Sequence, residues 1–305
     1  MQKTLIVIAG PTAIGKTSLT IRLARDYNSE IISADSRQIF KEMAIGTAVP
    51  EPEELKTVPH HFIQNVSIHD DYNASSYEHQ ALAKLKELFK VHDLIFMTGG
   101  SGMYIEAVCS GIDKMPNIKP QIREKASALL KNNGKEALQE ILKKADPVYY
   151  SETDINNPAR LVRGVEMYWQ TGKPFSFFRK KQTRPRDFNI IRISLDTDRD
   201  VLHKRINQRV DQMVAKGLID EVKNLRQWQN MVPLKTVGYQ EIFQYLNGAT
   251  SLDEAIELIK RNTRRYARKQ LSWFRRNKVT SWFAPNEYES IKKHIDDAIR
   301  QEKTL

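Results

Sequence analysis

The 305-residue chain carries, at positions 10–17, the sequence Gly10-Pro11-Thr12-Ala13-Ile14-Gly15-Lys16-Thr17, which fits the pattern G-x-x-x-x-G-K-[ST]. An apolar run precedes it and a helical pattern follows it, so the order is strand, glycine-rich turn and helix. The glycines of such a loop let backbone N–H groups converge on phosphate oxygens, while the helix N-terminus adds positive charge. Lys16 supplies a further charge and the Thr17 hydroxyl can ligate Mg²⁺. Taken alone, the loop favours a nucleoside triphosphatase or a small-molecule kinase.

The sequence on either side of this loop alternates between strand and helix patterns. We expect strands at 4–9, 30–34, 94–98 and 190–195, and helices at 16–26, 76–90, 200–216, 218–228, 239–246 and from Ser251 onward. Between 116 and 187 the patterns are helical only, at 121–131, 135–144 and 158–169. The prediction is an α/β fold: a P-loop NTPase-like parallel sheet core (1–115 and 188–305), an inserted all-helical subdomain (116–187) and a helical C-terminal region.

Positive charge is concentrated in two segments of the chain. There are 48 Lys and Arg residues against 37 Asp and Glu, a formal net charge of +11. Residues 260–278 hold nine basic residues and no acidic one, and residues 173–192 hold seven against Asp187. Like charges repel unless a polyanion neutralises them, so nucleic acid is the expected partner. A solvated helix face is the alternative. The phosphate contacts expected on the C-terminal segment are Arg264, Arg265 and Arg268.

Several classes of protein are excluded by composition. A single cysteine, Cys109, supplies neither a disulfide framework nor a Cys-rich zinc site. No apolar run approaches about 18 residues and no signal peptide is evident, so we expect a cytoplasmic protein without a membrane partner. The lack of an obvious exposed apolar helix favours a monomer. His60, His61 and His69 lack a ligand pattern and are expected to form hydrogen bonds or face RNA instead of holding a metal.

Two features suit the acceptor side of a transfer reaction. Asp35 follows the second expected strand, so its carboxylate should lie at the same sheet edge as the phosphate loop and could take a proton from a nucleophile. A helix cap or an outer ligand of Mg²⁺ is the alternative role. Arg205 and Arg209 are four residues apart on one helix face and could aim a guanidinium at a diphosphate, or could be a plain surface pair.

Further short motifs occur in order along the whole chain. They are Ser33-Ala34-Asp35-Ser36-Arg37-Gln38, Ile45-Gly46-Thr47-Ala48, Pro59-His60-His61, Gly99-Gly100-Ser101-Gly102-Met103-Tyr104, residues 205–213, Val237-Gly238-Tyr239, and residues 261–276 with Gln270-Leu271-Ser272-Trp273-Phe274. Together with the phosphate loop they resemble the bacterial tRNA dimethylallyltransferase family, also called tRNA isopentenyltransferases, nearly from end to end.

The resemblance implies a specific reaction and specific site residues. The loop Gly10, Pro11, Thr12, Ala13, Ile14, Gly15, Lys16 and Thr17 would hold the diphosphate of dimethylallyl diphosphate, with Mg²⁺ on Thr17. Asp35 would be the base that activates N6 of the adenosine next to the anticodon, and Arg209 would bind the diphosphate together with Lys16. The anticodon stem-loop of tRNA would contact Asp35, Ser36, Arg37, Gln38, Ser101, Arg123, Ala159, Arg160, Leu161, Val162 and Arg163.

Some positions depart from the family pattern, and other functions stay open. Ile14 stands where the family usually has Ser, Ser101 where Thr is commoner, and Ala159 where Gln is frequent. The eukaryotic members' zinc finger would need cysteines that this chain lacks.

The alternatives are prenyl transfer to free adenine nucleotides, a P-loop kinase or ATPase acting on a metabolite, and a non-catalytic RNA-binding protein that senses nucleotides.

Overall fold

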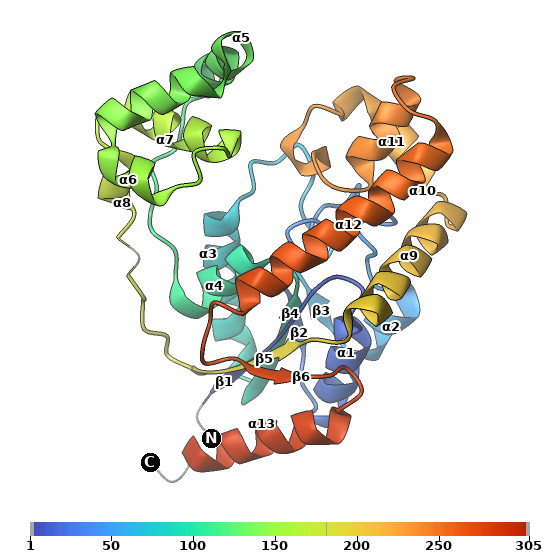
Figure 1. Ribbon diagram of the computed structural model, residues 1–305. Helices are drawn as coiled ribbons and strands as arrows, with labels where there is room; N and C mark the ends of the chain where they lie inside the picture. The colour runs from blue at the N-terminus through green and yellow to red at the C-terminus, as the bar shows by residue number, and fades with distance from the viewer. Residues whose placement is uncertain (1–2, 181, 303–305) are drawn as a thin grey trace. The chain divides into compact units, whose positions relative to one another are not determined.

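A single six-stranded parallel sheet forms the centre of the larger of two compact units (Figure 1). The structure is a computed structural model that describes residues 3–180 and 182–302. The strand order is β3-β2-β4-β1-β5-β6, and each neighbouring pair is parallel. The strands are β1 (Thr4–Ala9), β2 (Ile31–Ser33), β3 (His60–His61), β4 (Leu94–Gly99), β5 (Asn189–Leu195) and β6 (Ser281–Phe283). The predicted parallel α/β core is therefore confirmed.

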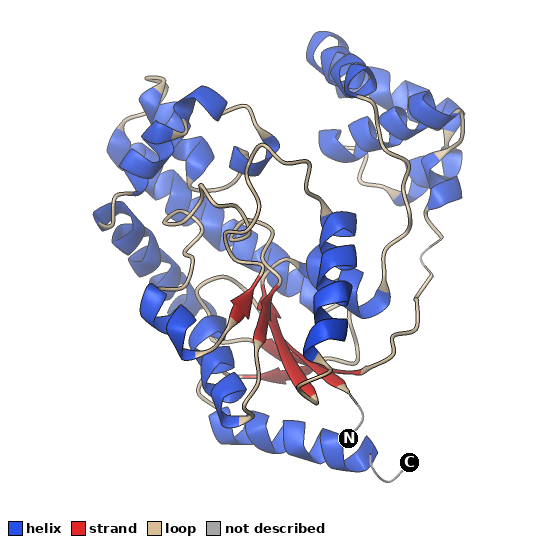
Figure 2. Cartoon of the chain, turned by 180° about the vertical axis from the view of Figure 1, so that it is seen from behind, coloured by secondary structure: helices blue, strands red, loops and turns tan. Residues whose placement is uncertain are grey.

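Helices cover both faces of this sheet, as Figure 2 shows from behind. Alternation along β1 sends Leu5 and Val7 into one apolar cluster and Ile6 and Ile8 into the other, which is why its whole run is apolar. The helices of this unit are α1 (Lys16–Asp26), α2 (Pro52–Thr57), α3 (Ala74–Leu88), α4 (Gly102–Ser110), α9 (Arg199–Ala215), α10 (Leu218–Asn224), α11 (Tyr239–Leu246), α12 (Leu252–Phe274) and α13 (Tyr288–Glu302), with 3₁₀ turns at Arg226–Trp228 and Val232–Leu234.

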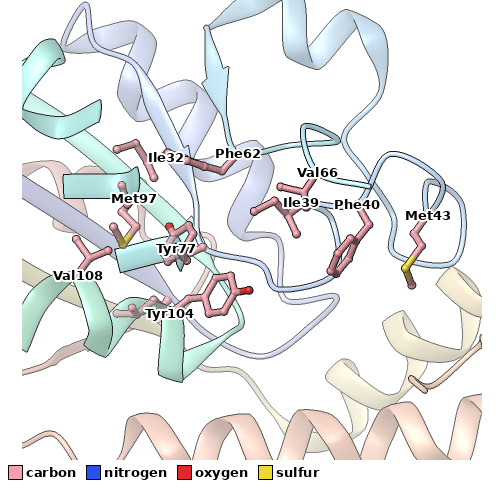
Figure 3. Packing of buried hydrophobic residues seen from close by; sticks show 14 of the residues in the cluster. Ile32, Ile39, Phe40, Met43, Phe62, Val66, Tyr77, Met97, Tyr104 and Val108 are labelled. Atoms are coloured by element: carbon pink, nitrogen blue, oxygen red, sulfur yellow. The ribbon is translucent and has the colours of Figure 1, made fainter. Parts of the chain in front are cut away.

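The larger apolar cluster packs around the end of β2, two residues before Asp35 (Figure 3). Tyr77 of α3 is fully buried and stacks on Tyr104 of α4 with ring centroids 4.3 Å apart. Its hydroxyl donates a hydrogen bond of 2.9 Å to the carbonyl of Ser33, the last residue of β2. A buried hydroxyl needs such a partner, so packing and hydrogen bonding together hold the chain just before Asp35.

The second compact unit, Ser110–Arg184, is helical and has its own apolar core. It holds α5 (Pro120–Ala145), α6 (Pro147–Glu152), α7 (Pro158–Thr171) and α8 (Phe175–Phe178). Its two ends are adjacent, because the backbone N–H of Arg184 donates to the carbonyl of Ser110 at 2.8 Å. The boundaries expected from sequence were 116 and 187. Lys181, counted among the basic residues of 173–192, lies outside the described residues.

Most expected elements are confirmed, with corrections at their ends. The predicted helices 121–131 and 135–144 are joined in α5 at a kink where Gly134 has φ 75°. The predicted helix 218–228 stops at Asn224 and continues as a 3₁₀ turn. Strands β3 and β6 and helices α2, α4, α6, α8 and α13 were not predicted. None of the described helices combines the length and apolar character needed to cross a bilayer.

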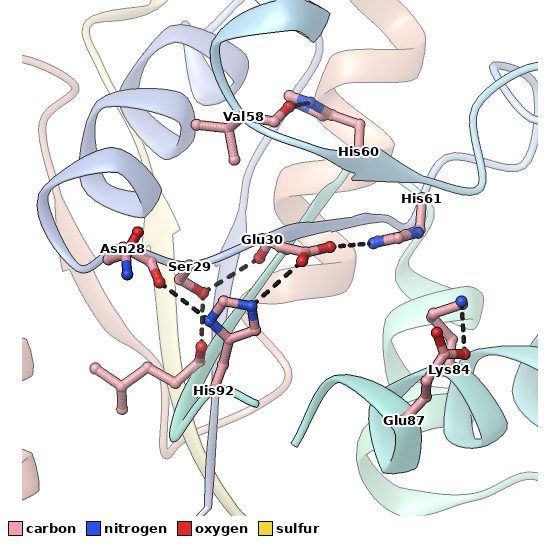
Figure 4. A network of polar contacts seen from close by, with 10 residues as sticks. Asn28, Ser29, Glu30, Val58, His60, His61, Lys84, Glu87 and His92 are labelled. Carbon is pink, nitrogen blue, oxygen red and sulfur yellow. Dashed lines mark hydrogen bonds and ion pairs between the residues drawn. The ribbon is translucent and has the colours of Figure 1, made fainter. Parts of the chain in front are cut away.

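The carboxylate of Glu30, at the opposite end of β2 from Asp35, lies between two histidines (Figure 4). Glu30, just before β2, faces His61 Nε2 at 2.6 Å and His92 Nε2 at 3.2 Å. Desolvation raises the pKa of Glu30, but the hydrogen bonds and charges of the two histidines outweigh it and the net pKa is lowered. The ionised form of Glu30 is therefore the one that the fold favours.

Stability should consequently fall as acid protonates Glu30. Since its pKa is lower in the folded chain than in the unfolded one, its contribution is present above the unfolded value of about 4.5 and is lost as the pH falls through the folded value. The difference in melting temperature between the wild type and Glu30→Gln should shrink from pH 6 to about pH 3. Thermal unfolding by circular dichroism measures it, with Glu53→Gln, an exposed residue of α2, as control. A pH-independent difference would contradict the assignment.

Candidate active site

The carboxyl ends of three adjacent strands meet at one edge of the sheet and form a cavity of about 380 Å³. The phosphate loop follows β1, Asp35 follows β2, and Gly100 follows β4. Ligands of open parallel sheets bind at this edge because the strand-to-helix loops gather there. The predicted site residues that line the cavity are Thr12, Lys16, Thr17, Asp35, Ser36, Arg37, Gln38 and Arg209.

The phosphate loop lies between β1 and α1, as its sequence predicts. Gly15, the residue before α1, has φ 101°, a left-handed conformation that favours glycine. Lys16 Nζ donates to the carbonyl of Pro11 at 2.7 Å. Ile14 is fully buried in the core beneath the loop, so the apolar side chain at this position replaces a hydroxyl without blocking the backbone donors. Loop amides other than that of Thr12, which donates to Gln270, can therefore serve as anion donors.

Two arginines of α9 approach the loop from different directions. Arg209 Nη1 donates to Thr12 Oγ1 at 3.4 Å and lines the cavity. Arg205 is exposed, and its Nη1 donates to the carbonyl of Ile14 at 3.2 Å on the outer side of the loop. Of the two, only Arg209 can therefore present its guanidinium to a ligand inside the cavity. The i,i+4 spacing placed both on one helix face but did not separate these roles.

The cavity concentrates positive charge in a desolvated place. Desolvation, with a further contribution from the neighbouring Arg209, lowers the pKa of Lys16 to about 7, and Asp35 acts in the opposite direction. Desolvation also lowers the pKa of Arg209, against the raising effect of Asp35 and Glu54. Two cations that are poorly solvated and close together form a site for a polyanion, whose binding would relieve both penalties.

Asp35 is oriented by its own turn. Its Oδ1 accepts hydrogen bonds from the backbone N–H of Arg37 at 2.9 Å and of Gln38 at 3.3 Å. Ser101 stabilises the same turn, because its Oγ accepts from the N–H of Ser36 at 2.9 Å and donates to the Ser36 hydroxyl. Within residues 3–180 and 182–302 no donor to Asp35 Oδ2 is found, and Asp35 is among the residues that line the cavity. In the described part of the chain no helix directly follows Asp35, so the carboxylate holds a turn instead of capping a helix, and this role is compatible with a role in chemistry.

Gln270 of α12 connects the phosphate loop to the loop after β4, and the sequence-based site did not include it. Its Oε1 accepts from the N–H of Thr12 at 2.9 Å and its Nε2 donates to the carbonyl of Gly100 at 2.9 Å. The residue is only 6 % exposed. The sequence signal that could have identified Gln270 is a glutamine at a core-facing position of a basic helix. A buried amide needs hydrogen-bond partners, and here they are backbone groups of two loops.

Part of the cavity lining is apolar. It comes from α9, α12 and the segment before α11: Met213 and Val237 are partly exposed, whereas Ile206, Val210 and Ile259 are buried. The lining therefore combines cationic side chains at the phosphate loop with partly exposed apolar ones.

The basic residues of α12 divide into paired and exposed ones. Arg264 donates to Asn207 Oδ1 at 2.6 Å, and Lys260 pairs with Asp211 at 2.8 Å. Arg275, just past the helix end, pairs with Asp196. The remainder of the set within the helix is exposed: Arg261, Arg265, Arg268 and Lys269. These four side chains form the exposed basic face of α12.

The expected RNA-contacting residues of the helical unit lie near the start of two helices. Arg123 is exposed on α5, and Ala159 and Arg160 are exposed on the first turn of α7, which the Asn157 side chain caps. Arg163 faces Glu166 at 3.7 Å. Leu161 requires a correction, because its side chain is fully buried in the core of this unit, against which Val162 also packs. The buried side chain offers no surface to RNA.

His60 and His61 form side-chain hydrogen bonds, which is one of the two roles expected for the histidines. His60 Nδ1 faces the carbonyl of Val58 at 2.7 Å, and His61 binds Glu30. His69 packs edge-on against Trp228. No group of three or more His, Cys, Asp or Glu side chains able to hold a metal occurs among the residues that the structure describes.

Comparison with known proteins gives consistent matches over the chain. A family model described as IPP transferase matches residues 38–277. A tRNA dimethylallyltransferase of Christiangramia forsetii is 48% identical over 299 residues, covering 98% of each chain. The tRNA dimethylallyltransferase 2 of Parabacteroides distasonis is 45% identical and covers 97% of this chain and 99% of its own.

Solved structures resemble the fold as well. The full-length tRNA isopentenylpyrophosphate transferase of Bacillus halodurans is 34% identical with a TM-score of 0.74, over 100% of this chain and 99% of its own. A eukaryotic dimethylallyltransferase described as acting on tRNA is 25% identical with a TM-score of 0.70, over 89% of this chain and 69% of its own. Both similarities extend over most of this chain.

Proposed function

Because the chain belongs to the IPP transferase family of tRNA dimethylallyltransferases, we propose that it prenylates tRNA. The dimethylallyl group of dimethylallyl diphosphate is transferred to N6 of the adenosine next to the anticodon, and diphosphate is released. The partner is the anticodon stem-loop, whose unpaired bases can leave their stack at a cost of a few kcal/mol.

The observation that carries the proposal is that the cavity is lined by both cationic and apolar side chains. A dimethylallyl diphosphate has a polyanionic head and a short apolar tail, and the cavity is lined by Lys16, Thr12 and Arg209 and also by the partly exposed side chains of Met213 and Val237. A kinase for a polar metabolite would gain nothing from apolar side chains in the lining. The same cavity contains Asp35, the carboxylate needed on the acceptor side.

The residues of the cavity can perform each part of the transfer. The adenine N6 amine is a poor nucleophile because its lone pair is delocalised into the ring, so it needs a base as the C–N bond forms. Asp35 Oδ2 accepts that proton while Oδ1 stays bound to its turn. Lys16, Arg209 and the loop amides stabilise the negative charge that grows on the departing diphosphate.

Magnesium fits the residues present at this end of the cavity. Mg²⁺ prefers oxygen ligands, keeps several waters and is usually bound by substrate phosphates with one or two protein oxygens. The Thr17 hydroxyl lines the cavity beside Thr12 and Lys16 and would hold the ion there. When bound, the ion would supply further charge neutralisation to the leaving diphosphate.

The charge distribution supports an RNA acceptor over a free nucleotide. Arg261, Arg265, Arg268 and Lys269 form an exposed face on α12 that a mononucleotide would not reach. Arg123, Arg160 and Arg163 of the helical unit, with Ser36, Arg37, Gln38 and Ser101 near Asp35, complete the proposed RNA contacts. We also propose that the protein is a monomer, which light scattering can test.

Removing two charges from the exposed face of α12 should weaken tRNA binding and reduce its salt dependence. The variant is Arg265→Gln with Arg268→Gln, and Arg264 is kept because it binds Asn207. The slope of log K against log salt should fall by roughly 0.7–0.9 for each phosphate that the variant no longer neutralises. Filter binding at several salt concentrations measures it, with Arg25→Gln and Lys86→Gln, exposed residues of α1 and α3, as the matched control. Equal slopes in both double variants would make the α12 charges a solvated face.

A transfer assay tests the proposed function against its alternatives. The protein is incubated with Mg²⁺, labelled dimethylallyl diphosphate and either unmodified tRNA or AMP. Label should enter tRNA, and digestion should recover it on N6 of the adenosine next to the anticodon. Label in AMP alone would indicate a nucleotide prenyltransferase. No transfer, together with metabolite-stimulated ATP hydrolysis, would overturn the proposal in favour of a kinase.

A further inference from the structure

A carboxylate outside the cavity holds three consecutive backbone amides of a loop that borders it. Glu221, in the first turn of α10, accepts hydrogen bonds from the N–H groups of Ala44 at 3.0 Å and Ile45 at 2.7 Å through Oε2. Its Oε1 accepts from the N–H of Gly46 at 2.9 Å. Hydrogen bonds to an ionised acceptor are roughly twice as strong as neutral ones, so these three bonds strongly constrain residues 44–46.

Tyr239 completes this anchor from α11. Its hydroxyl donates to Glu221 Oε1 at 2.6 Å, and its ring is fully buried against Gly46. A Cβ at Gly46 would lie 2.6 Å from the ring, so only glycine permits this approach. The motifs Ile45-Gly46-Thr47-Ala48 and Val237-Gly238-Tyr239, far apart in sequence, are thereby joined through one glutamate.

The anchored loop leads directly to Asp35. Residues 44–46 are followed by Thr47 and Ala48, whose carbonyls accept from Gln38 Nε2 at 3.2 Å and 2.7 Å. Gln38 in turn donates its backbone N–H to Asp35 Oδ1. A continuous set of hydrogen bonds therefore runs from the glutamate to the carboxylate of Asp35, while Gly46, Thr47 and Gln38 line the cavity itself.

We propose that Glu221, with Tyr239, is a positioning residue for the transfer: it fixes the 44–48 loop, and through Gln38 it fixes the orientation of the Asp35 carboxylate. The inference rests on the proposed function. Glu221 does not touch the phosphate loop, so its effect falls on turnover and on the acceptor side, and binding of dimethylallyl diphosphate is independent of it. Misplacement of a catalytic group by about 1 Å can cost about 100-fold in rate.

Glu221→Gln is the informative substitution because it preserves shape but removes the charge and one of the two acceptor oxygens. One end of the amide becomes an NH₂ group facing backbone N–H donors, which cannot bond to it. We expect kcat for tRNA prenylation to fall about 10- to 100-fold, with the dissociation constant for dimethylallyl diphosphate unchanged within about twofold. Tyr239→Phe removes a single bond and should lower kcat less, which provides a test even if Glu221→Gln folds poorly.

Asp220→Asn is the matched control, because it removes the same charge from the same first turn of α10 at a position outside the anchor. It should retain wild-type kcat. Hydrogen exchange of the peptide containing residues 44–46 should accelerate at least about tenfold in Glu221→Gln and stay unchanged in Asp220→Asn. A double-mutant cycle with Gln38→Ala should give a double variant little worse than the more severe single one, since both act along one route.

The outcomes separate this inference from the proposed function. If the wild type transfers no label to tRNA, the proposed function fails first. If the wild type is active and Glu221→Gln keeps its kcat, or loses activity only in proportion to its folded fraction, Glu221 has no positioning role. Additive effects of Glu221→Gln and Gln38→Ala would likewise overturn the proposed route.

Discussion

Replacing Asp35 with asparagine should lower kcat by about 10²–10⁴-fold while tRNA and dimethylallyl diphosphate still bind. The amide oxygen can keep the bonds from the N–H groups of Arg37 and Gln38, so the turn survives. The NH₂ group that replaces Oδ2 cannot accept the proton of the N6 amine. Single-turnover transfer from labelled dimethylallyl diphosphate measures the loss at the chemical step.

The comparison for this variant is Asp71→Asn, an exposed aspartate outside the cavity, which should behave as wild type. Equal losses in tRNA affinity and in turnover for Asp35→Asn would mean that Asp35 mainly binds RNA. Wild-type turnover would remove it from the role of base altogether.

The second large effect is expected at Lys16. Lys16→Met should weaken binding of dimethylallyl diphosphate by about 30-fold or more, since a charged partner in a desolvated site contributes about 2 kcal/mol or more. Because the pKa of Lys16 is about 7 without ligand, the amine is already protonated below pH 7. Above pH 7 it is mostly neutral and must take up a proton when the diphosphate raises its pKa.

Affinity should therefore fall by up to about tenfold per pH unit above pH 7, and binding at pH 8 should take up nearly one proton. Isothermal titration in two buffers of different ionisation enthalpy measures the uptake. Lys16→Met should show none, whereas Lys56→Met, at an exposed position of α2, should match the wild type. Identical binding enthalpies in the two buffers for the wild type would exclude Lys16 as the titrating group.

Elements with strong local patterns were predictable to the residue. β1 and α1 begin and end where the apolar run and the phosphate loop place them, and α12 starts with the capping box of Ser251 and Glu254. β3 and β6 have two and three residues, too few for any periodicity, and they exist because a neighbouring strand supplies hydrogen bonds. Their formation is a tertiary effect that local sequence does not encode.

The same distinction applies to the site. The phosphate loop and Asp35 could be identified because each follows a recognisable strand, and parallel strands bring their carboxyl ends together. Glu221 and Gln270 could not, since their roles arise from hydrogen bonds to groups at least 170 positions away in the chain. Leu161 shows the opposite error: it was expected to contact RNA because of its place in a motif, but its side chain is buried in the core of the helical unit.

The adjacent ends of the helical unit also bear on how the chain folds. β1 must pair with β5, and the segment that separates them contains the whole of Ser110–Arg184. The entropy of closing a chain loop grows only with the logarithm of its length, about 0.6 kcal/mol for each doubling. Where the ends of an insertion are already bonded to each other, as Ser110 and Arg184 are, the effective loop is shorter still. A helical module of this size therefore adds only a small entropic cost to the pairing of β1 with β5.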